Sequence, residues 1–144
     1  SNWDFVLAML AIVAMGVKIS FFMKQEAFKW PLKSLFLALG GIPLDRSAPE
    51  NTVDQACEWF KQKEKVWLVI TPEGTRSKVQ RWKTGFLRIA WQAQVPIVLV
   101  AWDYPSKTMV MDKVITSAGN FEQELNEIQQ YILSRYSGRH PENQ

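Results

Sequence analysis

Short apolar runs alternate with amphipathic stretches along most of this chain, and this alternation constrains the fold more than any other feature of the sequence. Strands are predicted at residues 17–23, 42–44, 66–70, 96–101 and 108–115. Helices are predicted at residues 27–39, with an interruption at Pro31, and at 49–62, 85–94 and 120–136. Strands and helices in alternation indicate an α/β protein with a mainly parallel sheet covered by helices on both faces.

Polar residues stand where strands are predicted to end. Asp45 and Arg46 follow the strand at 42–44, and an acidic and basic turn follows the strand at 66–70. Asp4 opens the first predicted helix, which should follow a strand before Ser1. Because ligand crevices in open α/β sheets lie outside the carboxyl ends of the strands, these three segments are predicted to form one site.

The turn after residues 66–70 carries groups suited to a phosphorylated ligand. It contains Glu73, Gly74, Thr75 and Arg76. A glycine lets the backbone approach a ligand closely, and an arginine can bind a phosphate through paired N–H donors. The alternative for this turn is that it is exposed to solvent and binds no ligand. The alternative for Asp45 and Arg46 is a weak surface ion pair.

These segments resemble motifs of the glycerolipid acyltransferases, the 1-acylglycerol-3-phosphate acyltransferase family. The turn at 72–76 resembles the Pro-Glu-Gly-Thr-Arg block of the family, and residues 41–46 resemble the block before it. Residues 83–86 resemble the entry to the next helix, and 95–100 resemble the last block, with Leu99 where the family often has proline. The blocks occur in the family's order. The resemblance implies a glycerolipid acyltransferase-like α/β fold and a single acyltransferase domain over residues 1–144 that lacks its amino-terminal part.

The first motif of the family is His-x-x-x-x-Asp. If Asp4 is its aspartate, the histidine lies two residues before Ser1. The resemblance then makes Asp4 the catalytic candidate, because it would orient the histidine that removes a proton from the acceptor hydroxyl. His140 stands in a polar tail and is expected to be solvated. The 144 residues alone are therefore expected to fold but to be inactive.

The resemblance implies an enzyme that moves a fatty acyl group from a thioester, acyl-CoA or acyl carrier protein, to a hydroxyl of a lysophospholipid such as 1-acylglycerol-3-phosphate. The implied substrate-binding residues are Asp45, Arg46, Glu73, Gly74, Thr75 and Arg76. No cofactor is implied beyond the thioester co-substrate, and the sequence lacks Cys/His spacing typical of a metal site. The implied location is the cytoplasmic face of a membrane, reached peripherally or through an anchor before Ser1.

Basic residues follow the Glu-Gly-Thr turn, in a chain whose net charge is +3. They are Arg76, Lys78, Arg81, Lys83 and Arg88. They suit a phosphate head group, the nucleotide of coenzyme A, an acidic carrier protein or an anionic membrane surface. Nucleic acid is not expected as a partner, because no recognised binding module accompanies this short stretch.

Two other function classes stay open on the residues alone. A non-catalytic module that binds phospholipid or phosphate would explain the anion site. An enzyme of another reaction type that binds phosphate esters would explain the same charged groups without a lipid.

Other apolar residues have plainer interpretations. Residues 5–17 form an uncharged run of 13 residues. Spanning a bilayer takes roughly 20, so a buried helix is predicted. Cys57 is predicted to be a small core residue rather than a nucleophile. Trp3, Trp30 and Trp82 are candidates for a lipid-facing rim, although partly exposed structural tryptophans would fit equally well.

Overall fold

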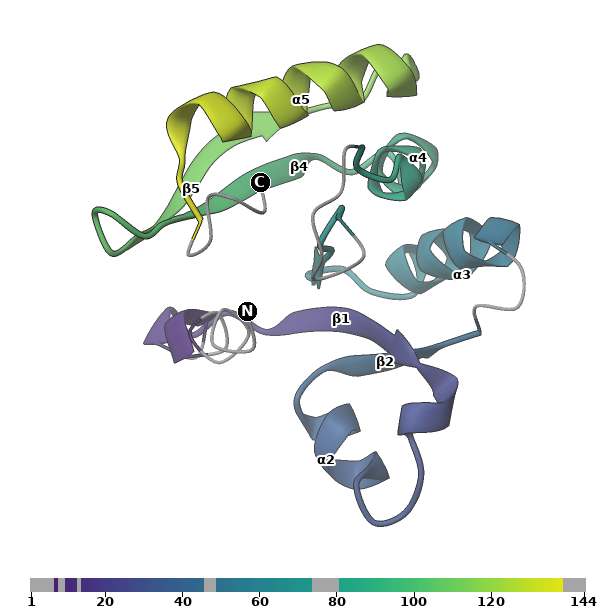
Figure 1. The fold of residues 1–144 in the computed structure, drawn as a ribbon. Coiled ribbons are helices and arrows are strands. Elements are labelled where there is room, and N and C mark those ends of the chain that lie inside the picture. Colours follow the sequence, from purple (N-terminus) through teal and green to yellow (C-terminus); the bar gives the residue numbers. More distant parts are fainter. Residues whose placement is uncertain (1–6, 8–9, 13, 46–48, 74–80, 139–144) are drawn as a thin grey trace. The chain divides into compact units, whose positions relative to one another are not determined.

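The structure is a computed structural model that describes all residues except 1–6, 8–9, 13, 46–48, 74–80 and 139–144 (Figure 1). The chain divides into two compact units, Ser1–Ile70 and Thr71–Gln144. The predicted single domain over residues 1–144 stays a prediction.

A three-stranded parallel sheet forms the centre of the first unit (Figure 1). β1 (Ile19–Lys24) is the middle strand, between β2 (Gly41–Leu44) and β3 (Trp67–Val69). Phe21 of β1 stands opposite Gly41 on one side and Val69 on the other. The parallel sheet expected from the alternating pattern is confirmed, while its cover by helices on both faces stays a prediction.

Helical segments connect these strands. η1 (Gln25–Ala27) and α2 (Lys33–Ala38) lie between β1 and β2, and α3 (Pro49–Lys61) lies between β2 and β3. The helix predicted at 27–39 is reduced to α2 because proline disfavours helical geometry in the residue before it and lacks an N–H to donate. α3 buries Ala56 and Cys57. The burial of Cys57 confirms its prediction as a small core residue, and this burial raises the pKa of its thiol.

Two glycines bring the α2 end close to β1. Gly40 has a φ of +89°, and a Cβ there would lie 2.1 Å from the backbone oxygen of Ile19. A Cβ on Gly41 would lie 2.8 Å from the carbonyl oxygen of Phe36. The N–H of Phe21 donates to the carbonyl of Gly40 at 3.1 Å. The chain thus enters β2 along a path that a side chain at Gly40 would block.

The described part of the predicted helix at 5–17 is helical at Leu7, at Leu10 to Ile12 and at Ala14. Leu10 is 62% exposed and Leu7 is 38% exposed. The predicted helix is therefore present up to Ala14 in its described part but not at residues 15–17, and the expected burial of these two leucines is not observed.

The second unit is a β-hairpin with two helices. α4 (Gly85–Ala93) precedes β4 (Ile97–Asp103) and β5 (Thr108–Ile115), which pair antiparallel, and α5 (Phe121–Arg135) follows. The four residues between β4 and β5 are too few for a parallel crossover, so β5 folds back beside β4. The strand at 108–115 is confirmed, but β4 and β5 form an antiparallel sheet of their own, so the predicted parallel arrangement holds for β1, β2 and β3 and not for β4.

Side chains from both helices and from β4 form the core of the second unit. Leu87, Leu99, Leu125 and Ile128 are buried together. Phe121 and Ile132 pack against them and extend an apolar stripe along α5, the helix predicted at residues 120–136. Tyr136 departs from this stripe because the helix ends at Arg135, and its hydroxyl donates to Oδ2 of Asp112 at 2.7 Å.

Glu124 fixes the start of α5. Its carboxylate accepts hydrogen bonds from the Ser117 hydroxyl at 2.6 Å, from the Ala118 N–H at 2.8 Å and from the Asn120 N–H at 3.2 Å. Burial acts against the charged form, but these donors outweigh it and hold the pKa of Glu124 below its usual value. The ionised carboxylate therefore ties α5 to the loop that leaves β5.

Candidate functional site

Asp45 stands at the carboxyl end of β2. It directly follows Leu44, which is buried and anchors the end of the strand, while Asp45 itself is exposed. Arg46, its predicted partner in binding the acceptor, lies outside the described residues. The structure therefore places one member of this pair at the strand end that the sequence predicted.

Glu73 belongs to the turn that opens the second unit. Pro72 and Glu73 form this turn, and the Glu73 side chain is half-buried. The N–H of Lys83 donates to the carbonyl of Pro72 at 3.0 Å. This bond joins the two ends of a segment that contains Gly74, Thr75 and Arg76, which lie outside the described residues.

α4 begins at Gly85, directly after that segment. This start confirms that residues 83–86 form the entry to a helix. Lys83 is exposed, whereas Phe86 packs against the core of the second unit. Lys83 thus presents its charge to solvent at the start of α4, and the packing of Phe86 holds this end of the helix in place.

The three strand ends of the first unit share one edge of the sheet. β1, β2 and β3 are parallel, so Asp45 emerges at the same edge as Ile70, the residue that precedes the acidic and basic turn. Asp4 lies outside the described residues. The convergence of Asp4, Asp45–Arg46 and the turn at 73–76 stays a prediction.

Two of the predicted anion-binding cations contact α5. Arg81 forms an ion pair with Glu122, and the Arg88 guanidinium lies 5.4 Å from the centre of the Phe121 ring. Both interactions lie within the second unit. They were not predicted from the sequence, since the spacing of charges does not show which helix lies beside them.

A pocket of about 260 Å³ lies between α3 and the strands β1 and β2. Its apolar wall includes Phe22, Ile42 and Trp59, and it extends to Leu44, next to Asp45. Its polar lining comes from Gln55, Glu58 and Gln62. The α3 members recur three and four residues apart, so the sequence carried a signal for this face of the helix. The pocket therefore has one apolar wall and one polar side, and its apolar wall can contact a hydrocarbon group.

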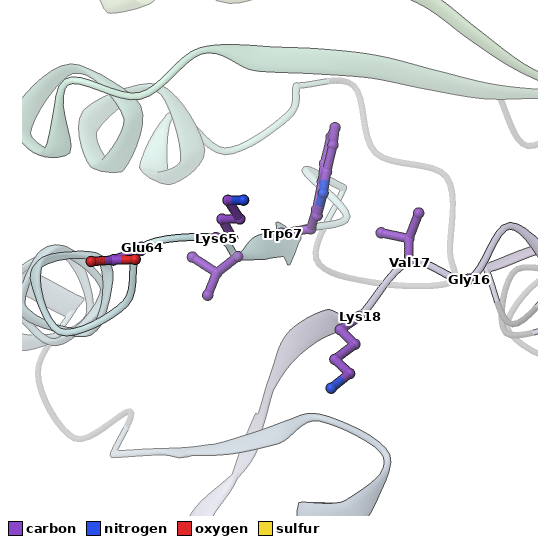
Figure 2. Close-up of a pocket in the computed structure, with 7 residues that line it drawn as sticks. Gly16, Val17, Lys18, Glu64, Lys65 and Trp67 are labelled. Carbon is purple, nitrogen blue, oxygen red and sulfur yellow. The ribbon is translucent and has the colours of Figure 1, made fainter.

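A larger pocket of about 520 Å³ lies at the opposite edge of the sheet (Figure 2). Lys18 precedes β1, and Glu64 and Lys65 precede β3. Figure 2 shows the Val17 and Trp67 side chains on one side and Lys18 on the other. Because this pocket opens at the amino ends of parallel strands, it is separate from the predicted site residues of the first unit.

Comparison with known proteins relates the chain to a family. Residues 1–102 match the family model described as acyltransferase. A 1-acyl-sn-glycerol-3-phosphate acyltransferase of Cocos nucifera is 37% identical over 81 residues. The alignment covers 52% of this chain and 26% of that relative, so the chain spans about a quarter of the relative's length. No solved structure matches the chain.

Proposed function

This chain belongs to the acyltransferase family, and we propose that it transfers a fatty acyl group from a thioester to a hydroxyl of a lysophospholipid such as 1-acylglycerol-3-phosphate. The observation that carries the proposal is the family match over residues 1–102, which includes every segment of the predicted site. The name of the coconut relative supports a glycerol phosphate as the acceptor.

The proposed reaction is a direct transfer between the two substrates. A histidine two residues before Ser1, oriented by Asp4, takes the proton of the acceptor hydroxyl as the oxygen attacks the thioester carbonyl. The carbon–sulfur bond then breaks, and the imidazolium returns the proton to the departing thiolate. The products are an ester and a free thiol, which belongs to coenzyme A or to an acyl carrier protein. The chain's own nucleophiles form no covalent intermediate in this scheme.

Binding of the acceptor falls to the segments after β2 and β3. In the proposal Arg46 and Arg76 bind the phosphate, while Asp45 and the turn at 73–75 shape the acceptor pocket. The hydrogen bond between Pro72 and Lys83 supports this role, because it fixes both ends of the segment that carries Arg76.

In the proposal, the acyl group of one substrate lies against the apolar wall of the pocket beside Leu44. Trp59 and Phe22 give it an apolar wall, and Asp45 follows directly at the sheet edge. A fatty acyl chain placed there would have its polar end near the proposed acceptor site. The substrates also place the protein at a membrane surface, for which we propose the cytoplasmic face.

Arg76→Ala tests the phosphate assignment, in a protein extended upstream to include the motif histidine. The KM for the phosphorylated acceptor should rise by about 10- to 150-fold, since a charge-assisted contact contributes about 1.5–3 kcal/mol. The KM for the thioester should change little. Arg135→Ala, which removes an exposed cation from the last turn of α5, is the matched control.

Equal effects of Arg76→Ala on acceptor and donor would refute the phosphate assignment. An extended protein that binds 1-acylglycerol-3-phosphate without any turnover would instead favour the non-catalytic phospholipid-binding module. Turnover of water-soluble phosphate esters, with no acyl transfer to lysophospholipid, would favour the third function class.

A further inference from the structure

Exposed apolar side chains concentrate around α2. Five large apolar side chains that are at least 40% exposed fall within residues 30–39. They are Trp30 at 92%, Leu32 at 49%, Leu35 at 52%, Leu37 at 47% and Leu39 at 40%. Single exposed apolar residues are ordinary, but a contiguous group on one short segment indicates an interaction surface.

α2 has a well-defined inner contact. The Phe36 ring packs edge-to-face against Phe28, with 6.1 Å between ring centres, and is half-buried. The carbonyl of Phe36 lies against Gly41 of β2. Figure 1 shows α2 and η1 on the far side of β2 from β1. Phe36 therefore attaches α2 to the edge strand, and the leucines are left outside this contact.

The remaining side chains give α2 little polar surface. Leu32, Leu35 and Leu39 follow one another three and four residues apart and form one stripe, and Leu37 stands on another side. A water-exposed helix normally presents a polar face, whereas one that is apolar around most of its circumference is covered by protein or lipid. Ser34 and Lys33 are the polar residues within α2.

The charged residues within this segment are lysines, while Glu26 of η1 lies just before it and Asp45 just after it. Lys29 and Lys33 are exposed at either side of Trp30, and no acidic residue occurs between residues 27 and 44. Tryptophan is enriched at the boundary between lipid and water, and lysines beside an apolar surface favour anionic head groups. The combination fits an anionic lipid surface better than a protein partner, which would require complementary apolar and acidic groups together.

We propose that α2 and the loop before it insert into the interfacial layer of an anionic phospholipid bilayer. This membrane surface consists of Lys29, Trp30, Leu32, Lys33, Leu35, Leu37 and Leu39. The six residues of α2 lie in the plane of the interface. No helix in the described part of the chain is long and apolar enough to cross a bilayer. The inference rests on the proposed function, because that function needs access to a lipid acceptor.

A fluorescent label at residue 35 tests the insertion directly. The 144-residue chain is made with Cys57→Ala, which removes its single cysteine, and with Leu35→Cys, which is then labelled with an environment-sensitive dye. Phosphatidylcholine vesicles that contain phosphatidylglycerol should shift the dye emission to the blue, and spin-labelled lipid should quench it. Lys63→Cys, an exposed position of the same unit outside both pockets, is the matched site that should stay in water.

Vesicle binding by charge and apolar variants provides the second measurement. Leu35→Asp should weaken binding about tenfold or more, because it replaces a leucine that enters the interface. Leu133→Asp changes an exposed leucine on α5 and should leave the affinity unchanged. Lys29→Gln with Lys33→Gln should weaken binding to phosphatidylglycerol vesicles several-fold and reduce its salt dependence. Since these lysines are exposed, this variant tests the inference even if Leu35→Asp fails to fold.

Three results would overturn the inference. The first is that the Leu35→Asp and lysine variants bind vesicles with the same affinity as the unmodified chain. The second is a blue-shifted label without vesicles that grows with protein concentration, which would show that a second copy covers the surface. The third is a label that is shielded at every dilution, which would show that the chain itself covers it.

The measurements also separate this inference from the proposed function. Insertion is detected without turnover, so a protein that inserts but transfers no acyl group would fail only the proposed function. An extended protein that acylates a short-chain, water-soluble acceptor but does not bind vesicles would fail only the membrane inference.

Discussion

Gly40→Ala should be strongly destabilising, and the reason can be calculated from the entry into β2. A residue with a Cβ at a φ of +89° costs about 1–2 kcal/mol. The Cβ would also lie 2.1 Å from the backbone oxygen of Ile19, so β1 must move, and such overpacking costs about 1–3 kcal/mol. The lower entropy of the unfolded alanine chain recovers about 0.4–1 kcal/mol. The net loss is about 1–4.5 kcal/mol.

The assay is urea unfolding followed by far-ultraviolet circular dichroism. The matched control is Gly85→Ala, since a Cβ at Gly85 meets no atom within 4 Å and alanine favours the helix α4. The control should be neutral or more stable by up to about 1 kcal/mol. If Gly40→Ala unfolds within about 0.5 kcal/mol of the unmodified chain, the close approach of Gly40 to β1 has been misjudged.

Three further predictions concern other parts of the molecule. Glu124→Gln should make the free energy of unfolding less sensitive to acid. Because the folded-state pKa of Glu124 is lowered, its stabilisation is present above the unfolded pKa of about 4.3 and is lost as pH falls through the folded pKa. The difference in stability between the Gln and Glu proteins should therefore shrink across that pH window. A constant difference from pH 7 to pH 3 would show that the bonds to Ser117 and its neighbours do not depend on the charge. Leu125→Ala should cost about 2–5 kcal/mol in the same unfolding assay, because Leu125 is fully buried, and a loss below about 1 kcal/mol would contradict its place in the core. Asp4→Asn, in a protein extended to include the motif histidine, should lower kcat by about three to four orders of magnitude with little change in Tm, whereas near-normal turnover would leave Asp4 as a structural residue.

Most element positions were predictable because apolar periodicity is local. The run at 66–70 contains β3, and the stripe through Leu125 and Ile128 marks α5. The antiparallel return of β5 was not predicted, although the four-residue connection after Asp103 carried the signal. The exposure of Leu35 could not have been predicted, because an apolar helical stripe looks the same whether protein or lipid covers it.

The candidate site was likewise predicted in part from the sequence. Asp45 was placed correctly at a strand end, because its position follows from the strand alone. The contacts of Arg81 and Arg88 with α5 were missed, because they depend on packing between segments more than 30 residues apart in sequence. Local pattern thus predicts where a side chain leaves the sheet, and tertiary packing decides what it meets.

The hydrogen bond between Pro72 and Lys83 also bears on how acceptor preference can diverge between relatives. It closes a loop of ten residues whose ends are set by β3 and α4. Doubling the length of a closed loop costs only about 0.6 kcal/mol, so insertions between these two residues are cheap while the bond persists. If the segment between these residues binds the acceptor phosphate, as proposed, selection can exchange it as a unit and alter which head group is accepted. A chimaera that carries a relative's loop between Pro72 and Lys83 should keep its Tm and acquire that relative's acceptor preference.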